Sequence, residues 1–541
     1  MIRFTTWFNC SLAVICLMAC SHKQSSDKVV FRYNESSGIA SLDPAFAKNQ
    51  SIMWPVHQLY NTLVEVDDSL RIRSSLATRW EFSADKTTIL FYLRNDVFFH
   101  DDPVFNNNKG RALTAHDVAY SLQRILSPET ASPGAWIFNN RVDSLQPFTA
   151  LNDTVFQLKL LKPFQPILGI LSMQYCSIVP KEAVQQYGND FRRHPVGSGP
   201  FQFVAWVEGQ ALVLKKNKNY FEKDSSGQAL PYIDGIKVSF FDSKATEFLE
   251  FRQNRLDFIN DIDASFKDEM LTKTGHLKKE WKGIIQLNTS PYLNIEYLGI
   301  LVDTNNLLLK NSPLKIKQVR QAINYGINRK KMMLYLRNSI GTAAESGFIP
   351  QGLPSFNAAL VKGYTYDPQK ARALLSEAGF PDGTNMPAIK LLTIPIYTNL
   401  ASYVANELKQ VGINVQVESI QKSLLLEKTS KNQATFFRGS WIADYPDAEN
   451  YLSVFYSKNP SPPNYTRYKN PAFDLLYEQA LQEKSDSMRF GLYQKMDQLV
   501  IADAPIVPLW YDMALHLVHP NITGFKPNGL NMLELRRIKK Q

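Results

Sequence analysis

The amino-acid sequence predicts an α/β protein with at least two domains. Segments with the alternating pattern of β-strands and segments with the 3.6-residue periodicity of helices follow one another along the chain, which favours this fold class. About 520 residues remain after an N-terminal targeting segment, which is too many for one hydrophobic core. Apolar residues make up 44% and charged residues 20%, as is typical of a folded globular protein.

The N-terminus has the pattern of a secretory signal peptide over residues 1–19. One arginine precedes a mostly apolar run with its core at residues 12–18, which is too short to predict a transmembrane helix. Residues 17–20 (Leu-Met-Ala-Cys) resemble a bacterial lipobox, so we expect Cys20 to carry acyl chains such as palmitate. Two or more chains anchor a protein stably to a bilayer, and residues 20–28 form a polar tether. The alternative is an ordinary signal peptide with a chance cysteine.

Cysteine content and charge exclude some functions. Cys176 is the one cysteine outside the signal peptide and the attachment site, so no intrachain disulfide is expected; its apolar neighbours predict burial. The formal net charge is +10, with basic residues scattered along the chain. This charge is typical of a solvated surface that faces an anionic membrane, and nucleic-acid binding is not expected of an exported protein.

Strands and helices are predicted in alternation. Strands are expected at residues 29–33, 90–94, 155–160, 211–214 and 236–241. Thr114 and Asp117 form a capping-box pattern at the start of a helix, and Asp367 followed by a proline starts another. Residues 390–417 read strand, helix, strand, a βαβ unit whose loops could line a cleft.

Three other patterns are interpreted as structural. Residues 195–200 (Pro-Val-Gly-Ser-Gly-Pro) lack the lysine of a phosphate-binding loop and the full nucleophile elbow, so they predict a rigid turn. Ser83 and Lys86 have the spacing of penicillin-targeted enzymes, but the companion motifs are missing and a turn between strands is favoured. His100, His516 and His519 do not form a cluster with metal-ligand spacing.

The chain carries a series of motifs in a characteristic order. They occupy residues 41–45, 93–101, 113–118, 195–201 with 217–221, 319–329, 371–380 and 441–447. The series resembles the substrate-binding proteins of peptide and nickel ABC importers, the extracellular solute-binding family 5, over essentially the whole mature chain. Each motif alone is weak, but their shared order makes coincidence improbable.

The resemblance implies a two-lobed periplasmic binding protein of class II type, in its large form with an extra inserted domain and a hinge between lobes. The first lobe would comprise residues 29–51, 180–286 and 505–541, the inserted domain residues 52–179, and the second lobe residues 287–504. It also implies a monomer without catalysis, metal or cofactor. This monomer would sit in the cell envelope, in the periplasm, and deliver captured peptides to the permease subunits of an ABC transporter.

The resemblance also implies site residues. Asp444 matches the aspartate that holds the peptide amino terminus in the family, and Arg438, six residues earlier, matches an arginine that meets the peptide carboxylate in oligopeptide binders. Such ions need partners, because a buried unpaired charge is costly. Structural roles remain open for both. Further expected lining residues, each of which could equally be core, are Trp441, Tyr445, Lys48, Asn49, Gln50, Trp510, Tyr511, and Trp136 as a substitute for an aromatic residue absent at Gly134.

The sequence favours one ligand class without excluding others. Dipeptide binders carry an arginine in the loop that corresponds to residues 395–400, and this chain has none there, which favours oligopeptides. The alternatives are a nickel chelate, haem, an oligosaccharide or a signalling peptide on the same fold. A different class, an envelope hydrolase, is the remaining alternative.

Overall fold

The computed structural model describes residues 28–483 and 485–541. Cys20, the signal peptide and all of the tether except Lys28 lie outside the described residues. The lipid anchor therefore stays a prediction. None of the helices that the structure describes in these two ranges is long and apolar enough to cross a lipid bilayer.

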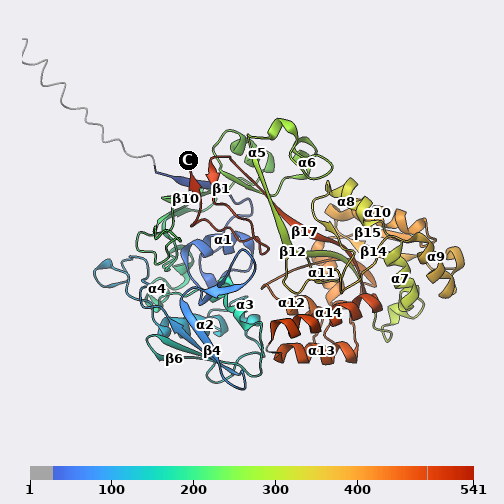
Figure 1. The fold of residues 1–541 in the computed structure, drawn as a ribbon, viewed down its shortest axis with the longest axis horizontal. Coiled ribbons are helices and arrows are strands. Elements are labelled where there is room, and N and C mark those ends of the chain that lie inside the picture. The colour runs from blue at the N-terminus through green and yellow to red at the C-terminus, as the bar shows by residue number, and fades with distance from the viewer. Residues whose placement is uncertain (1–27, 484) are drawn as a thin grey trace, which may run out of the picture.

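One mixed sheet of eleven strands connects two bodies of the molecule (Figure 1). Its strand order is β15-β14-β16-β12-β17-β11-β1-β10-β9-β8, with β13 paired to β17. We call the body around β1 and β8–β11 the first lobe and the body around β14–β16 the second lobe. The strands are β1 (Val30–Asn34), β8 (Phe201–Val207), β9 (Ala211–Lys216), β10 (Gly235–Ser239), β11 (Phe258–Asn260), β12 (Gln286–Ile300), β13 (Thr342–Ala343), β14 (Ile389–Thr393), β15 (Val415–Ser419), β16 (Phe436–Ile442) and β17 (Ile506–Val518).

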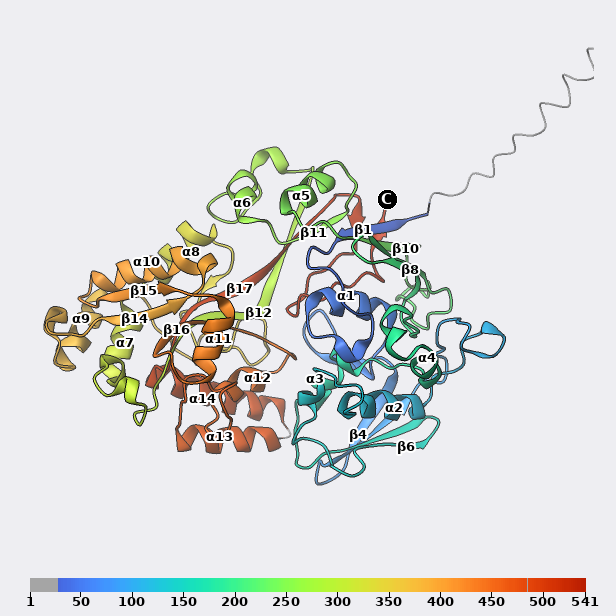
Figure 2. The same cartoon turned by 180° about the vertical axis from the view of Figure 1, so that it is seen from behind.

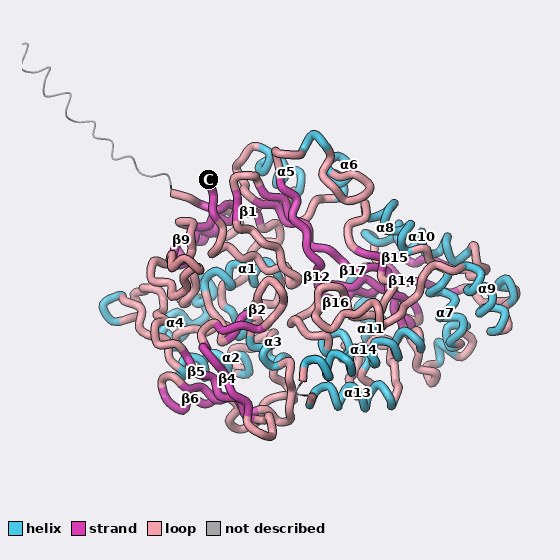
Figure 3. The backbone as a smooth tube through the Cα atoms, in the orientation of Figure 1, coloured by secondary structure: helices cyan, strands magenta, loops and turns pink. Residues whose placement is uncertain are grey.

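Two long antiparallel strands, β12 and β17, pass from one lobe to the other (Figure 3). Their pairing runs from Gln286 with Val518, near β11, to Gly299 with Ile506, near the centre of the second lobe. The register shifts between Pro291 and Ile295. Such an irregularity interrupts the ladder and bends the strand between the two lobes.

A separate four-stranded sheet lies beside the first lobe, in the order β4-β5-β7-β6. Its strands are β4 (Ala77–Phe82), β5 (Thr88–Leu93), β6 (Phe148–Asn152) and β7 (Val155–Lys159). Helix α2 (Ala115–Leu126) packs on it and starts as predicted, because the Thr114 amide donates to Asp117 Oδ2 at 2.9 Å. Alternate residues such as Phe91 and Phe156 enter one core shared with the first lobe.

The second lobe contains the predicted βαβ unit. Strands β14 and β15 pair in parallel, and α10 (Thr398–Lys409) connects them. Helices cover both faces of this part of the sheet (Figure 2). One face packs on α7 (Lys317–Tyr325), α8 (Arg329–Arg337), α9 (Pro368–Glu377) and α10, the other on α12 (Glu449–Leu452), α13 (Pro471–Gln482) and α14 (Asp486–Asp503). Since side chains alternate along a strand, β12 contributes Ile295 and Tyr297 to the second face and Leu298 and Ile300 to the first.

The remaining elements complete the two lobes and the connections between them. They are α1 (Gln50–Leu59), β2 (Val64–Val66), β3 (Ile72–Ser74), α3 (Ile167–Leu171), α4 (Lys181–Tyr187), α5 (Lys244–Arg252), α6 (Ala264–Met270), α11 (Lys422–Ser430), β18 (Ile522–Thr523) and β19 (Lys539–Lys540). The residue ranges expected for the lobes and the inserted domain stay a prediction. Because β12 and β17 each run through both lobes, no single residue separates them.

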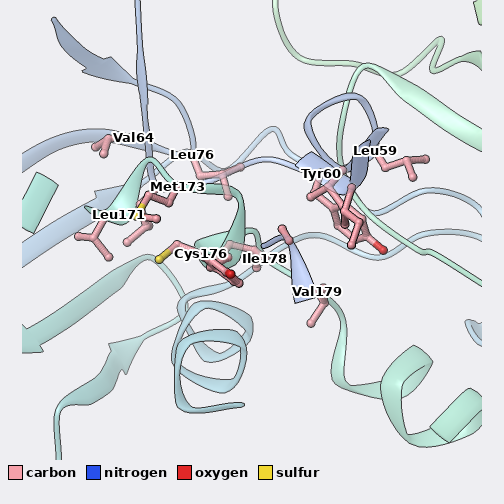
Figure 4. Close-up of a cluster of buried hydrophobic side chains, with 14 of the residues drawn as sticks. Leu59, Tyr60, Val64, Leu76, Leu171, Met173, Cys176, Ile178 and Val179 are labelled. Carbon is pink, nitrogen blue, oxygen red and sulfur yellow. The ribbon is translucent and has the colours of Figure 1, made fainter. Parts of the chain in front are cut away.

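The motifs interpreted as structural have structural roles. A Cβ at Gly197 would lie 2.0 Å from the Leu59 carbonyl oxygen, so this turn needs glycine for close backbone approach. His100 Nε2 lies 2.9 Å from the Gly199 carbonyl oxygen in the same buried region. Ser83 Oγ donates to Asp85 in the turn between β4 and β5. Cys176 is buried among apolar side chains (Figure 4), and burial raises the pKa of its thiol.

Asp497 of α14 provides a test of the second-lobe packing. Its carboxylate is buried and accepts hydrogen bonds from the Phe348 and Ile349 amides at 2.7 and 3.3 Å, and no basic residue that the structure describes forms an ion pair with it. Burial raises the pKa of Asp497 to about 7. The folded state therefore holds its proton more tightly than the unfolded state, and stability should fall as pH rises from about 4 through about 7.

We expect Asp497→Asn to remove this loss. Urea unfolding at pH 5 and pH 8 should show a smaller decrease in unfolding free energy for the variant than for the wild type, by about 1–4 kcal/mol, because the amide cannot ionise. Asp382→Asn, an exposed position, is the control and should keep the wild-type pH dependence. An equal pH dependence in Asp497→Asn would contradict the argument.

Candidate functional site

Asp444 follows the last residues of β16 and faces the first lobe across a cavity of about 150 Å³. Its carboxylate keeps contact with solvent, although protein atoms surround most of it. Desolvation raises the pKa of Asp444, while a hydrogen bond from Asn450 and the positive charge of Arg141, a first-lobe residue, act in the opposite direction.

Each acidic residue that lines this cavity, with one exception, has a basic partner in the protein. Glu65 and Glu534 lie 2.7 and 2.8 Å from the guanidinium of Arg536. Asp67 lies 3.2 Å from Arg71, and Asp68 lies 3.7 Å from Lys526. Among the residues that the structure describes, Asp444 is the one acidic lining residue without a basic group within 4.0 Å. An ammonium group would therefore find a carboxylate without an ion-pair partner here.

Asn450 and Trp441 hold this carboxylate in place. Asn450 Nδ2 donates to Asp444 Oδ2 at 3.1 Å, and Asn450 Oδ1 accepts from Trp441 Nε1 at 2.9 Å. Asn450 thus links Trp441 to Asp444, two residues that the resemblance places at the ligand site. No periodic pattern or motif in the sequence marked Asn450.

Tyr445 connects the second lobe to the first. Its side chain is 1% exposed, and its hydroxyl donates to Glu449, which also accepts from Tyr477. A Cβ at Gly169 in α3 would lie 3.4 Å from Cβ of Tyr445, so the two lobes touch at this point. Tyr445 packs in the core of the first lobe rather than lining the cavity.

Arg438 lies in β16 and is paired with a carboxylate of its own protein. Its Nη2 lies 2.6 and 2.5 Å from the two carboxylate oxygens of Glu296 in β12, and the side chains are 12% and 4% exposed. The Tyr397 ring covers the guanidinium, with the centroid 3.9 Å from Cζ. Burial raises the pKa of Glu296 to about 7, against the opposing charge and hydrogen bond of Arg438.

A second ion pair lies next to the first. Arg337 at the end of α8 is 2.8 Å from Asp512 in β17, and Asn294 Nδ2 donates to Asp512 at 3.1 Å. The Arg337 guanidinium lies over the ring of Trp510, which is buried and donates to no described group through Nε1. We call Asn294, Glu296, Arg337, Arg438 and Asp512 the balanced cluster, because its two arginines match its two acids. In this cluster, Arg337 Nε, Arg438 Nε and Asn294 Oδ1 are also buried without a hydrogen-bond partner among the described residues.

The other residues predicted to line the site lie either at the surface or inside one of the lobes. Asn49 is exposed and caps α1 by accepting from the Ile52 amide, and Gln50 hydrogen-bonds to Asn531 and Asn260 inside the first lobe. Lys48 is exposed. Tyr511 is buried in the second lobe and donates to the Gly347 carbonyl at 2.8 Å.

Tyr175 occupies the space that an aromatic side chain at position 134 would fill. A Cβ at Gly134 would lie 2.4 Å from Cδ1 of Tyr175, so the absent side chain makes room for this ring. Burial, together with the charge of Asp444, raises the pKa of Tyr175 to about 12. Its sequence neighbours Met173 and Gln174 line the cavity beside Asp444. Trp136, the substitute expected from the sequence, is 38% exposed. The one sequence feature that could have indicated Tyr175 is the glycine at position 134, because it leaves space for a neighbouring ring.

A larger hollow, of about 840 Å³, lies elsewhere on the first lobe. The Asp43 of the first sequence motif lines it, but its carboxylate is already paired with Arg124, whose Nη1 lies 2.7 Å away. No group of three or more histidine, cysteine or acidic residues in the described ranges has the arrangement of a metal site. The cavity beside Asp444 therefore remains the better candidate.

The chain matches known proteins over most of its length. It is 27% identical to the periplasmic oligopeptide-binding protein OppA of Salmonella typhimurium, over 93% of this chain and 90% of that protein. It is 25% identical to the haem-binding protein A of Haemophilus influenzae, over 93% and 90%. Among solved structures, HbpA2 from Haemophilus parasuis superposes with a TM-score of 0.81 at 23% identity, covering 95% of this chain and 99% of that one.

These likenesses agree with the architecture. A second solved structure, the murein tripeptide-binding protein MppA in its unliganded open form, gives a TM-score of 0.80 at 21% identity, with 95% and 98% coverage. The large two-lobed fold of a periplasmic binding protein is thereby confirmed. The family of bacterial extracellular solute-binding proteins, family 5 Middle, matches residues 71–463. This chain therefore belongs to the bacterial extracellular solute-binding proteins of family 5.

Proposed function

We propose that this protein captures peptides between its lobes and delivers them to the permease of an ABC importer without altering them. The observation that carries the proposal is the unpaired carboxylate of Asp444 in a cavity whose other acids are compensated. A peptide with a free N-terminus supplies the missing cation. The oligopeptide- and glutathione-binding relatives support the same ligand class.

The second-lobe strand β16 suits an extended ligand. Asp444 and Arg438 are six residues apart, which corresponds to at most about 20 Å along an extended chain. A ligand that contacts both would span about three to six residues. We propose Trp441, Tyr175 and Tyr397 as the aromatic surfaces near this path, with Trp510 behind the balanced cluster.

The other parts of the proposal concern location and assembly. We propose that Cys20 carries the acyl chains that anchor the protein to a membrane, and that a monomer operates from the periplasmic side. The register shift in the β12–β17 ladder supports a hinge between the lobes, because closure needs a point where the sheet bends. Residues Asn49, Gln50 and Trp136 of the first lobe are proposed to face the ligand after closure.

The haem-binding relative makes haem the second candidate ligand. Haem carries two propionates, which an unpaired carboxylate at Asp444 would repel, so the charge of the cavity favours a cationic group. Titration calorimetry of the mature protein with peptide pools of two to eight residues and with haem decides between them. Saturable heat with peptides supports the proposal, and flat titrations with every peptide length refute it.

Asp444→Asn should weaken peptide binding at least tenfold. The substitution keeps the side-chain shape but removes the charge that holds the ammonium, and a hydrogen bond to a charged group contributes about 1.5–3 kcal/mol. Calorimetry of both proteins with one peptide pool measures the effect. Asp382→Asn, the same change at an exposed second-lobe position, should bind like the wild type. Unchanged affinity in Asp444→Asn would remove Asp444 from the proposed site.

Gly134→Ala should lower both stability and peptide affinity. The backbone at this position suits any residue, with φ −85°, but the added methyl group would collide with the Tyr175 ring. Overpacking of this kind costs about 1–3 kcal/mol, and a displaced Tyr175 would no longer contact ligand.

The matched control for this substitution is Gly491→Ala. No atom lies within 4 Å of a Cβ at Gly491 in α14, so alanine there should be neutral or stabilising and leave binding unchanged. Urea unfolding and peptide calorimetry on both variants make the comparison. If Gly134→Ala matches Gly491→Ala in both measurements, Tyr175 does not depend on the missing side chain.

A further inference from the structure

The two charged ends of the proposed site differ in one respect. Asp444 has one neutral side-chain donor, Asn450, and no basic group within 4.0 Å in the described parts of the chain. Arg438 has a full counter-charge, since both oxygens of Glu296 lie within 2.6 Å of its Nη2. Asp444 therefore lacks an ion-pair partner that a ligand could supply, whereas the charge of Arg438 is already balanced by Glu296.

A ligand carboxylate could bind Arg438 only by displacing Glu296 or by approaching beside it. Displacement would leave Glu296, which is 4% exposed, buried without its cation, and this is strongly unfavourable. Approach beside it would place two carboxylates on one guanidinium, which is unfavourable because like charges repel. Arg337 does not relieve this, because Asp512 already pairs with it at 2.8 Å.

A neutral oxygen meets no such obstacle. The peptide carbonyl of a longer chain, or a C-terminal amide, can accept from the part of the guanidinium that Glu296 does not use, without adding charge to the balanced cluster. The Tyr397 ring on the guanidinium and the tyrosine hydroxyl 3.5 Å from Glu296 hold the arginine in its pair with Glu296.

We infer that the site reads the ammonium group of its ligand but not a C-terminal carboxylate, so that its ligands are peptides with a free N-terminus and an unrestricted C-terminus. This inference rests on the proposed peptide-binding function. It assigns Glu296 the role of a specificity-determining residue that acts through Arg438. Amidated peptides, and peptides that extend beyond Arg438, belong to the same ligand class as short free acids.

A tetrapeptide library in three chemical forms tests the inference. Wild-type protein is titrated at pH 8, where Glu296 is ionised, with the unmodified, the N-acetylated and the C-amidated library. We expect acetylation to weaken binding at least tenfold and amidation to weaken it less than fivefold. A loss of fivefold or more on amidation overturns the inference. If none of the forms binds, the proposed peptide function itself fails, which is a different result.

The variant Glu296→Gln tests the mechanism. Removal of the counter-charge should make Arg438 available, so that the unmodified library binds at least fivefold more tightly than to wild type while the amidated library does not gain. Glu407→Gln is the matched control, since Glu407 is also 4% exposed and pairs with Lys331 at 3.1 Å away from the site. The affinities of Glu407→Gln for the unmodified and the amidated library should both equal those of the wild type.

Circular dichroism establishes whether Glu296→Gln is folded. A folded variant that shows no gain for free acids overturns the role of Glu296. If the variant does not fold, the wild-type comparison of amidated with unmodified peptides still decides the inference.

Discussion

The pairing of β12 with β17 is the constraint on which the candidate site depends. These two strands form the connection between lobes and at the same time carry Glu296, Asn294 and Asp512 of the balanced cluster. Side-chain alternation then sends Ile295 and Tyr297 into one apolar core while Glu296 faces the partner residue Arg438 on β16. A slip of one residue in this ladder would exchange these faces, so the hydrogen bonds that set the register also set the geometry of the candidate site.

Asp444 and Arg438, the two charged residues of the candidate site, are positioned in different ways. Asn450 orients Asp444 through a neutral hydrogen bond and so leaves its charge available. Glu296 orients Arg438 through a charge and so cancels it. The neutral hydrogen bond from Asn450 leaves the negative charge of Asp444 able to attract a cation. The ion pair with Glu296 cancels the charge of Arg438 and leaves only its N–H groups to bind a ligand. Asp444 can remain without an ion-pair partner because its carboxylate still contacts water. Glu296 and Arg438 are largely buried, and an unpaired charge there would be costly.

Local patterns in the sequence predicted local structure well. The capping residues Thr114 and Asp367 start helices as expected, and the βαβ unit at 390–417 is present, because both depend on residues close in sequence. The fold class followed from the alternation of strand and helix patterns, and Trp441 and Asp444 became candidate site residues through one motif. The partner of Arg438 could not be predicted, since Glu296 is 142 residues away and meets it only through the β12–β16 ladder. Asn450 lacked any signal because its role depends on the turn that brings it back to Trp441.

Tyr175 shows that site residues of related proteins should be compared by the volume they occupy and not only by their aligned sequence positions. The loop at residues 131–136 has a glycine where an aromatic residue was expected, and the nearest aromatic in sequence, Trp136, is partly exposed to solvent. The ring that fills the vacant volume comes from a segment 41 residues later, and the glycine is what permits it to lie there. Packing requires that the volume beside a cavity be filled, but it does not require that one position fill it. A missing side chain at a predicted contact is therefore a reason to ask which neighbour has moved into its place.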